Sequence, residues 1–304
     1  MKQRIFFAST AAAMAAFVFT LCLLPAAAGD TAPVAENLEL TTYRGVSVGG
    51  TLAATDPEGD PLTYRITTAP VKGTVDLQPE GSFVYTPGEG KRGKDYFGYV
   101  AEDPEGHCSQ EATVIIQITK AKTTVLYGDM AGNPGYADAV RLAERGIFTG
   151  EKIGSGYVFS PQTTVSRGEF LSMCMELTGQ EILLGAETTG FSDDSAIPQW
   201  QKPYLATALM HGTVSGYPNE EGTAFAANAP ITCTEAAVML NRMLNLTDVS
   251  ATNVSDEMPV WAGQAVANLS ACRILPRGFV PSAALTRVQA AQMLSAGLAL
   301  LESH

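Results

Sequence analysis

Basic residues are scarce in this sequence. It has 19 Lys and Arg against 31 Asp and Glu, which gives a formal net charge of −12 at pH 7. Nucleic-acid-binding proteins depend on clustered basic side chains that neutralise phosphates. The acidic balance therefore excludes nucleic acid as a partner.

Histidine is rare and cysteine is widely spaced. The chain has 3 His and 5 Cys, and the Cys residues lack the short spacings of a zinc site. A Gly-x-Ser-x-Gly string stands at 45–49, but the nucleophile motif of hydrolases needs a strand before it, a helix after it, and an acid and a His downstream. We predict that the protein is not an enzyme and that it has no cofactor and no metal centre.

Acidic turns are the one feature that suggests a cation. Asp56, Glu58 and Asp60 lie close together, and Asp103 and Glu105 form a similar turn. Calcium takes six or more oxygen ligands, and only a few are visible here. Because Asp-Pro-Glu-Gly is also favourable turn chemistry, we favour turns and leave calcium binding at Asp56 and Asp60 open.

A long apolar run occurs at the N-terminus. Lys2 and Arg4 precede an apolar stretch over 5–24, and three alanines ending at Ala28 follow it. A basic start, an apolar stretch and small residues at its end are typical of a secretory signal peptide. We expect 1–28 to be removed, leaving no membrane partner. The alternative is an uncleaved anchor helix, because the run is nearly long enough to span a bilayer.

Residues 31–120 predict an all-β domain. Short segments rich in β-branched and aromatic residues alternate with turns that contain Gly and Pro, which is typical of an antiparallel β-sandwich. These segments are 62–66, 82–85, 96–100 and 112–118. With the strings TDPEGDPLTYRI and ATVIIQI, the region resembles the cadherin-like and bacterial Ig-like modules of secreted surface proteins. The resemblance implies the fold and says little about a ligand.

A repeated string follows the linker near residue 121. The copies are FSPQTTVSRGEF from Phe159, FAANAPITCTEA from Phe225 and FVPSAALTRVQA from Phe279. Each carries a hydroxyl residue followed three positions later by Glu or Gln, which is the capping-box pattern of a helix start. Apolar residues then recur at helical spacing. Three helices are therefore predicted to start at the pairs Ser166 and Glu169, Thr232 and Glu235, and Thr286 and Gln289.

A second aligned feature lies upstream of each of these helices. An Asp precedes an aromatic residue that opens another amphipathic helix; the three pairs are Asp129 and Tyr136, Asp193 and Trp200, and Asp256 and Trp261. Glycine just past a helical run is a common C-terminal signal. The first two of these helices are therefore predicted to end at Gly146 and Gly212.

This order of motifs resembles the S-layer homology (SLH) domain, in copies at 125–180, 188–247 and 251–304. The resemblance implies a multidomain protein in which the β-sandwich precedes an all-α, three-repeat pseudo-trimer shaped as a three-pronged spindle. Grooves between the prongs are implied to bind an anionic, pyruvylated secondary cell-wall polysaccharide. Carried over position by position, the binding residues are Arg167, Arg287, Asp129, Asp193, Asp256, Tyr136, Trp200 and Trp261.

The sequence departs from the family pattern at Cys233, which stands where an Arg is expected. One groove thus loses its main cation, and two grooves at most are implied to bind. From the residues alone, Arg167 and Arg287 sit in first helix turns and are free to point outwards. There they are either solvated or paired with Glu144 or Glu169, or they bind a carboxylate or phosphate together with helix-start amides. For the aromatic residues, a core anchor is as good an interpretation as a sugar contact.

The resemblance implies a secreted bacterial cell-surface protein that the SLH repeats hold non-covalently to the wall. Its β-sandwich then projects outwards. The alternative is an envelope adhesion or assembly module, in which the grooves are degenerate and the β-sandwich binds a protein or a glycan.

The first testable prediction concerns processing. We expect the secreted protein to begin at Gly29, because small residues at 26–28 suit a signal peptidase. Intact-mass analysis of secreted protein checks this, and a mass that retains Met1 contradicts it.

Overall fold

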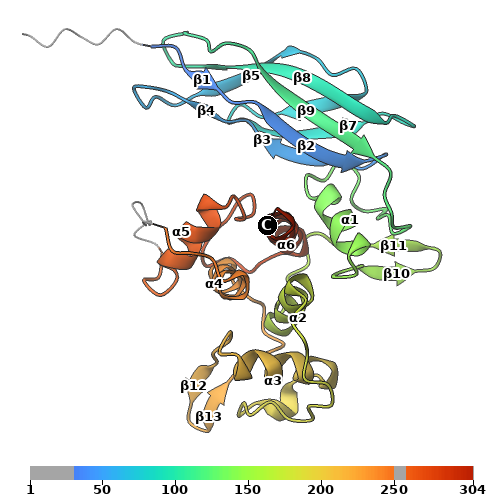
Figure 1. The fold of residues 1–304 in the computed structure, drawn as a ribbon, viewed down its shortest axis with the longest axis vertical. Helices are drawn as coiled ribbons and strands as arrows, with labels where there is room; N and C mark the ends of the chain where they lie inside the picture. The colour runs from blue at the N-terminus through green and yellow to red at the C-terminus, as the bar shows by residue number, and fades with distance from the viewer. Residues whose placement is uncertain (1–30, 250–257, 304) are drawn as a thin grey trace, which may run out of the picture.

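The computed structural model describes residues 31–249 and 258–303. The expected signal peptide and Asp256 lie outside these residues. Along the chain, a strand-rich part is followed by a helical part (Figure 1).

The strand-rich part contains two larger sheets and one short strand pair. The four-stranded sheet has the order β2-β9-β8-β5, the three-stranded sheet has the order β3-β7-β6, and β1 pairs with β4. The strands are β1 Val34–Ala35, β2 Leu38–Tyr43, β3 Val48–Thr51, β4 Ala54–Thr55, β5 Thr63–Thr68, β6 Gly73–Leu77, β7 Ser82–Pro87, β8 Gly93–Glu102 and β9 Ala112–Thr119.

Aromatic and β-branched side chains form the core between these sheets. Every second residue of β9 is buried, as expected for a strand with one face against a core. The rings of Phe83 and Phe97 meet edge to face, with their centroids 5.2 Å apart. The buried Tyr85 hydroxyl donates to Asp95 at 2.8 Å, so its polar end is satisfied. This arrangement agrees with the predicted β-sandwich.

One strand pair differs from the antiparallel prediction. β2 runs parallel to β9, from Leu38 beside Val114 to Tyr43 beside Thr119. Parallel neighbours need a long connection, and here strands β3 to β8 lie between them in the sequence. The direction of β2 depends on this long-range pairing, which local sequence patterns do not contain.

The predicted capping boxes are confirmed in the helical part. Ser166, Thr232 and Thr286 each accept a hydrogen bond from the amide three residues on, and the side chain there accepts from the cap amide. No described helix is both long and apolar enough to cross a membrane. The helices are α1 Tyr136–Glu144, α2 Arg167–Thr178, α3 Lys202–Met210, α4 Cys233–Leu244, α5 Gly263–Ala271 and α6 Arg287–Glu302, with short 3-10 turns at η1 Asp194–Ala196 and η2 Gln199–Gln201.

A closed ring of backbone hydrogen bonds joins the segments that precede the capped helices. The amide of Val165 donates to Leu285 at 2.9 Å, that of Leu285 to Ile231 at 2.8 Å, and that of Ile231 to Val165 at 3.0 Å. Each segment therefore donates to one of the others and accepts from the third. Around this ring α2, α4 and α6 lie together at the centre, while α1, α3 and α5 project on three sides (Figure 1). We call the projections that contain α1, α3 and α5 the first, second and third prong.

Two β-hairpins that the sequence did not predict extend from the first two prongs. They are β10 Glu151–Ile153 with β11 Gly156–Val158, and β12 Tyr217–Asn219 with β13 Gly222–Ala224. Each hairpin follows a predicted helix end, since Gly146 and Gly212 adopt φ values of 71° and 65°. Between α5 and α6, the described chain contains no such hairpin. Among the described residues, the third prong therefore lacks the β-hairpin that the other two prongs possess.

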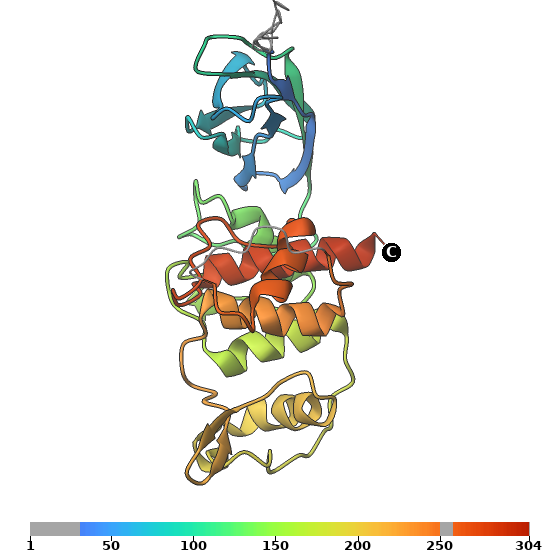
Figure 2. The same ribbon diagram turned by 90° about the vertical axis from the view of Figure 1, so that its left-hand side faces the viewer.

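The strand-rich part docks directly on the first prong (Figure 2). The amide of Gly49 donates to Pro134 at 2.9 Å, and the amide of Ala137 donates to Ser47 at 3.2 Å. The Ser47 hydroxyl also donates to the Asn133 carbonyl at 2.9 Å. Ser47, at the centre of the Gly-x-Ser-x-Gly string, thus serves as a buried contact between the two parts.

A backbone substitution tests the third prong. Arg273 has a φ of 56°, at the position that Gly146 and Gly212 occupy in the other prongs. A side chain in this conformation costs about 1–2 kcal/mol, and the exposed pair with Glu36 at 3.8 Å offsets little of that cost. We expect Arg273→Gly to raise the free energy of unfolding by about 1 kcal/mol, measured by chemical denaturation. Arg273→Ala keeps the Cβ and should give no gain; equal stability of the two variants contradicts this account.

Candidate functional site

The first residue of each capped helix occupies an equivalent position in the three copies. The amides of Arg167, Cys233 and Arg287 donate to the carbonyls of Ala229, Ala283 and Thr163, at 2.9, 2.9 and 2.8 Å. Each helix start therefore rests on the loop of another copy. The side chain at this first position is directed by the contact between the copies, and not by its own helix alone.

Arg167 does not point freely outwards, so that expectation is wrong. It is 6% exposed, its Nε donates to the Phe225 carbonyl at 3.1 Å, and its Nη1 lies 3.4 Å from Glu235. The guanidinium also stacks on the ring of Tyr217, 4.6 Å from the centroid. The partner is Glu235 of α4, and not Glu144 or Glu169 as in the alternative considered from the sequence. Tyr217 of the unpredicted β12–β13 hairpin covers the guanidinium.

Arg287 is held in a similar way but is less enclosed. Its Nη1 lies 3.0 Å from Glu151 and 3.2 Å from the Phe159 carbonyl. The guanidinium sits over the ring of Phe148 at 5.6 Å. The partner is again neither Glu144 nor Glu169, since Glu151 comes from the hairpin β10–β11.

The first candidate site is a cavity of about 320 Å³, which we call groove A. Arg167 from the first copy lies at one end, α4 and the loop before β12 form the walls, and Trp261 comes from the third copy. Trp261 is 61% exposed, so its ring is available for contact. Groove A is lined by Arg167, Thr213, Val214, Ser215, Gly216, Tyr217, Glu235, Val238, Met239, Arg242 and Trp261.

The second candidate site is a cavity of about 350 Å³, which we call groove B. Here Arg287 comes from the third copy, α2 and the loop after α1 form the walls, and Trp200 comes from the second copy. Trp200 is 56% exposed. Groove B is lined by Gly146, Ile147, Phe148, Val165, Glu169, Ser172, Met173, Glu176, Trp200, Tyr204 and Arg287.

The two grooves are built from equivalent positions. Counted from the capping hydroxyl, Glu235 and Arg242 of groove A occupy the same helix positions as Glu169 and Glu176 of groove B. Each groove thus combines an Arg, a helix wall and a Trp from three different copies. The sequence predicted the Arg and the Trp, but it did not single out the residue two turns beyond the capping Glu, although helical spacing places that residue on the same face.

Glu235, the capping Glu of α4, also contributes to the charge of groove A. Burial acts to raise the pKa of Glu235, but the hydrogen bonds from Tyr217 and the Thr232 amide, together with the charge of Arg167, bring it below the usual value. Burial and the hydrogen bond to Glu235 raise the pKa of Tyr217 to about 12. At neutral pH, Tyr217 is therefore a neutral donor to a charged Glu235, which offsets part of the charge of Arg167.

The third set of equivalent positions differs from the first two in both key residues. Cys233 replaces the Arg and is fully buried, and burial raises the pKa of its thiol. Tyr136 replaces the Trp and is 6% exposed, with its hydroxyl accepting from the Tyr127 amide at 3.1 Å. Of the two interpretations for the aromatic residues, the structure places Tyr136 as a core anchor and both Trp residues in grooves.

The predicted Asp residues bind backbone amides inside their own copy. Asp129 accepts from Phe159 at 3.0 Å and from Ser160 at 2.7 Å. Asp193 accepts from Phe225 at 2.9 Å and from Ala226 at 2.8 Å. Neither Asp is among the residues that line grooves A and B. Asp256 lies outside the described residues.

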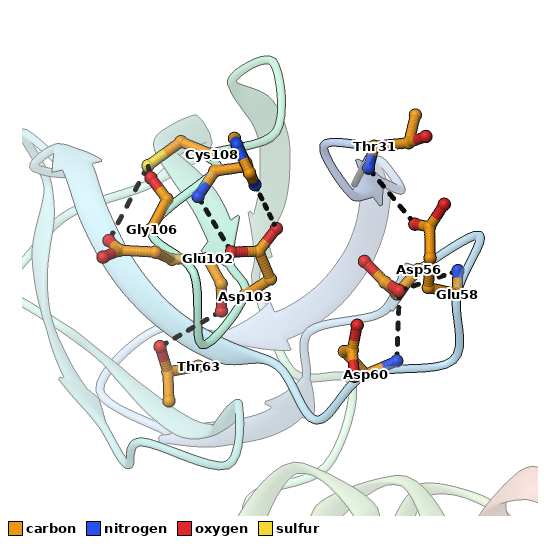
Figure 3. Close-up of polar contacts among 10 residues, drawn as sticks. Thr31, Asp56, Glu58, Asp60, Thr63, Glu102, Asp103, Gly106 and Cys108 are labelled. Carbon is orange, nitrogen blue, oxygen red and sulfur yellow. Dashed lines mark hydrogen bonds and ion pairs between the residues drawn. The ribbon is translucent and has the colours of Figure 1, made fainter. Parts of the chain in front are cut away.

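The acidic turns of the β-sandwich are occupied by local hydrogen bonds (Figure 3). Asp56 Oδ1 accepts from the amides of Glu58 and Asp60 at 2.9 and 3.0 Å. Asp103 accepts from the His107 amide at 2.8 Å. Within residues 31–249 and 258–303, no cluster of three or more His, Cys, Asp or Glu side chains is arranged to hold a metal ion. Asp56 and Asp103 make the local hydrogen bonds expected of turn residues.

Two protein-family models match the chain. Residues 25–120 match the bacterial cadherin-like domain, and residues 190–237 match the S-layer homology domain. A surface-layer 125 kDa protein of Lysinibacillus sphaericus is 30% identical over 145 residues, which are 46% of this chain and 12% of that protein. The chain therefore spans only a small part of that relative.

Two solved structures are similar to about a third of this chain. An endo-fucoidan hydrolase of glycoside hydrolase family 107 is 23% identical and has a TM-score of 0.25, with 31% of this chain and 14% of that chain covered. Human protocadherin-24 EC1-2 is 17% identical and has a TM-score of 0.26, with 30% and 46% covered. These TM-scores are too low to support an argument about function.

A stability measurement tests the role of the Asp residues. We expect Asp193→Ala to lower the free energy of unfolding by about 2–3 kcal/mol, because two amides lose a charged acceptor and Ala226 keeps its φ of 59° without support. Asp193→Asn retains one acceptor and should lose less. Chemical denaturation of both variants checks this, and an unchanged Asp193→Ala variant contradicts the anchoring role.

Proposed function

We propose that this chain, which carries a bacterial cadherin-like domain and an S-layer homology domain, anchors a cell-surface protein non-covalently to the bacterial cell wall. The ligand is an anionic secondary cell-wall polysaccharide with pyruvylated sugars, bound in grooves A and B. The helical part acts as a three-repeat SLH pseudo-trimer, and the β-sandwich projects from the wall. The families matched are surface and adhesion modules, and neither implies catalysis.

The observation that carries the proposal is the pairing of Arg with an exposed Trp in both grooves. Trp200 and Trp261 are the two Trp residues of the chain, and each lies more than half exposed in a separate groove. An exposed aromatic face suits the apolar face of a sugar ring. An Arg guanidinium can form charge-assisted hydrogen bonds with a carboxylate. An acidic sugar polymer needs both groups at once.

The overall charge of the chain adds a second constraint. With a net charge of −12, the protein meets an anionic polymer against general repulsion. Binding must therefore depend on a few cations placed in the grooves. Arg167 and Arg287 meet this description, since each lines one of the two grooves.

The second candidate function is an adhesion or assembly module, in which the β-sandwich binds a protein or a glycan and the grooves are inactive. The docking of the sandwich on the first prong leaves much of its surface uncovered (Figure 2). Binding to isolated wall sacculi separates the two functions. Anchoring predicts that the helical grooves are required for pelleting, and the adhesion module predicts that they are not.

We expect Arg167→Ala and Arg287→Ala to weaken binding to sacculi by roughly tenfold each, because a charged hydrogen bond is typically worth about 1.5–3 kcal/mol. Trp200→Ala and Trp261→Ala should weaken binding too, and both Trp are exposed enough for the fold to tolerate the change. Pelleting assays with sacculi, before and after extraction of the polysaccharide, provide the measurement.

Arg65→Ala is the matched control, because it removes the same charge from an exposed pair on the β-sandwich. It should leave pelleting unchanged. If all four groove variants fold and pellet like the parent protein, the anchoring proposal is wrong and the adhesion module takes its place.

A further inference from the structure

Grooves A and B have the same design but opposite charge. Groove A carries Arg167 and Arg242 against Glu235, whereas groove B carries Arg287 against Glu169 and Glu176. Glu151, which pairs with Arg287 at 3.0 Å, makes groove B more acidic still. The decisive difference is a single helix position, occupied by Arg242 in α4 and by Glu176 in α2.

Arg242 is the cation of groove A that remains available. The side chain of Arg167 is already committed to Phe225 and Glu235. Arg242 is exposed and makes no side-chain hydrogen bond or ion pair with any residue in the described part of the chain. It lies in the last turn of α4, where the helix dipole favours a positive charge. An incoming carboxylate can thus engage Arg242 without displacing another partner.

Glu176 is held in place as an acceptor. The hydroxyl of Tyr204, a groove B residue of α3, donates to it at 2.7 Å, and this hydrogen bond and burial raise the pKa of Tyr204 to about 12. A carboxylate near the C-terminal end of α2 is unfavourable for the helix itself. Such a group accepts hydrogen bonds from sugar hydroxyls, but it repels a second carboxylate.

We infer that groove A holds the anionic substituent of the wall polymer, with Arg242 as the residue that selects it, and that groove B holds uncharged sugar units. This inference rests on the proposed function and assigns different parts of one ligand to its two grooves. Trp261 in groove A and Trp200 in groove B then stack on sugar rings that differ in charge. Arg242 makes groove A prefer the charged sugar unit, while Arg167 shapes the groove through its stacking on Tyr217.

The two Trp residues allow each groove to be observed separately in the full chain. The indole signals in a ¹⁵N-labelled protein report groove A through Trp261 and groove B through Trp200, and Trp200→Phe and Trp261→Phe assign them. The probes are a methyl hexoside that carries a pyruvate ketal and the same hexoside without the ketal. We expect the ketal form to shift the Trp261 signal at concentrations at least tenfold below those that shift the Trp200 signal.

Charge exchange at the one differing position is the direct test. Arg242→Glu should abolish the preference of groove A for the ketal form, and Glu176→Arg should create that preference at Trp200. Arg65→Glu makes the same charge change as Arg242→Glu on the β-sandwich and should change neither titration. An unchanged Trp261 titration in Arg242→Glu, or stronger binding of the ketal form at Trp200 in the parent protein, overturns the inference.

Failure of the inference is distinct from failure of anchoring. If Trp261→Ala abolishes pelleting with sacculi while Arg242→Glu does not alter the ketal preference, only the charge assignment is wrong. If neither probe shifts either indole and the groove variants pellet normally, the anchoring function itself is wrong.

Discussion

The helical part depends on the ring of backbone hydrogen bonds among Val165, Ile231 and Leu285. Because each segment donates to one neighbour and accepts from the other, the three helix starts are held in a fixed relation. Each first helical residue then projects over the loop of another copy, and each groove draws its Arg, its helix wall and its Trp from three copies. An isolated copy therefore cannot form either groove, so the binding that we propose needs all three copies.

One of the three equivalent positions differs from the other two. Where Cys233 and Tyr136 replace Arg and Trp, the side chains are buried. Arg277 of the third prong extends to the Phe83 carbonyl of the β-sandwich at 3.4 Å. A Cβ at Gly49 would lie 2.0 Å from this guanidinium and 2.6 Å from Pro134 Cβ, so a larger residue would have to displace the Arg277 contact. The third position therefore joins the two parts of the protein, and its loss of a cation coincides with the docking of the β-sandwich.

Sequence patterns predicted the features that local chemistry determines. The capping boxes at Ser166, Thr232 and Thr286 depend on two residues within one turn, and all were found. The parallel pairing of β2 with β9, the two hairpins and the orientation of Arg167 depend on contacts between distant segments. An Arg at a helix start looks free in the sequence because the hairpin that covers it belongs to another copy. The sequence therefore predicted the local caps more reliably than the contacts between copies.

The first turn and the last turn of each capped helix differ in how far their residues are fixed by the fold. At the start of α2 and α4, Ser166, Glu169, Thr232 and Glu235 are committed to the caps, and a change there costs stability. Two turns later, Arg242 and Glu176 are exposed, so either charge is compatible with the same helix. Under the roles inferred for Arg242 and Glu176, a change of charge at that position alters the ligand preference of a groove without altering the ring. On this inference, the helix start maintains the groove and the last turn of the helix sets its ligand.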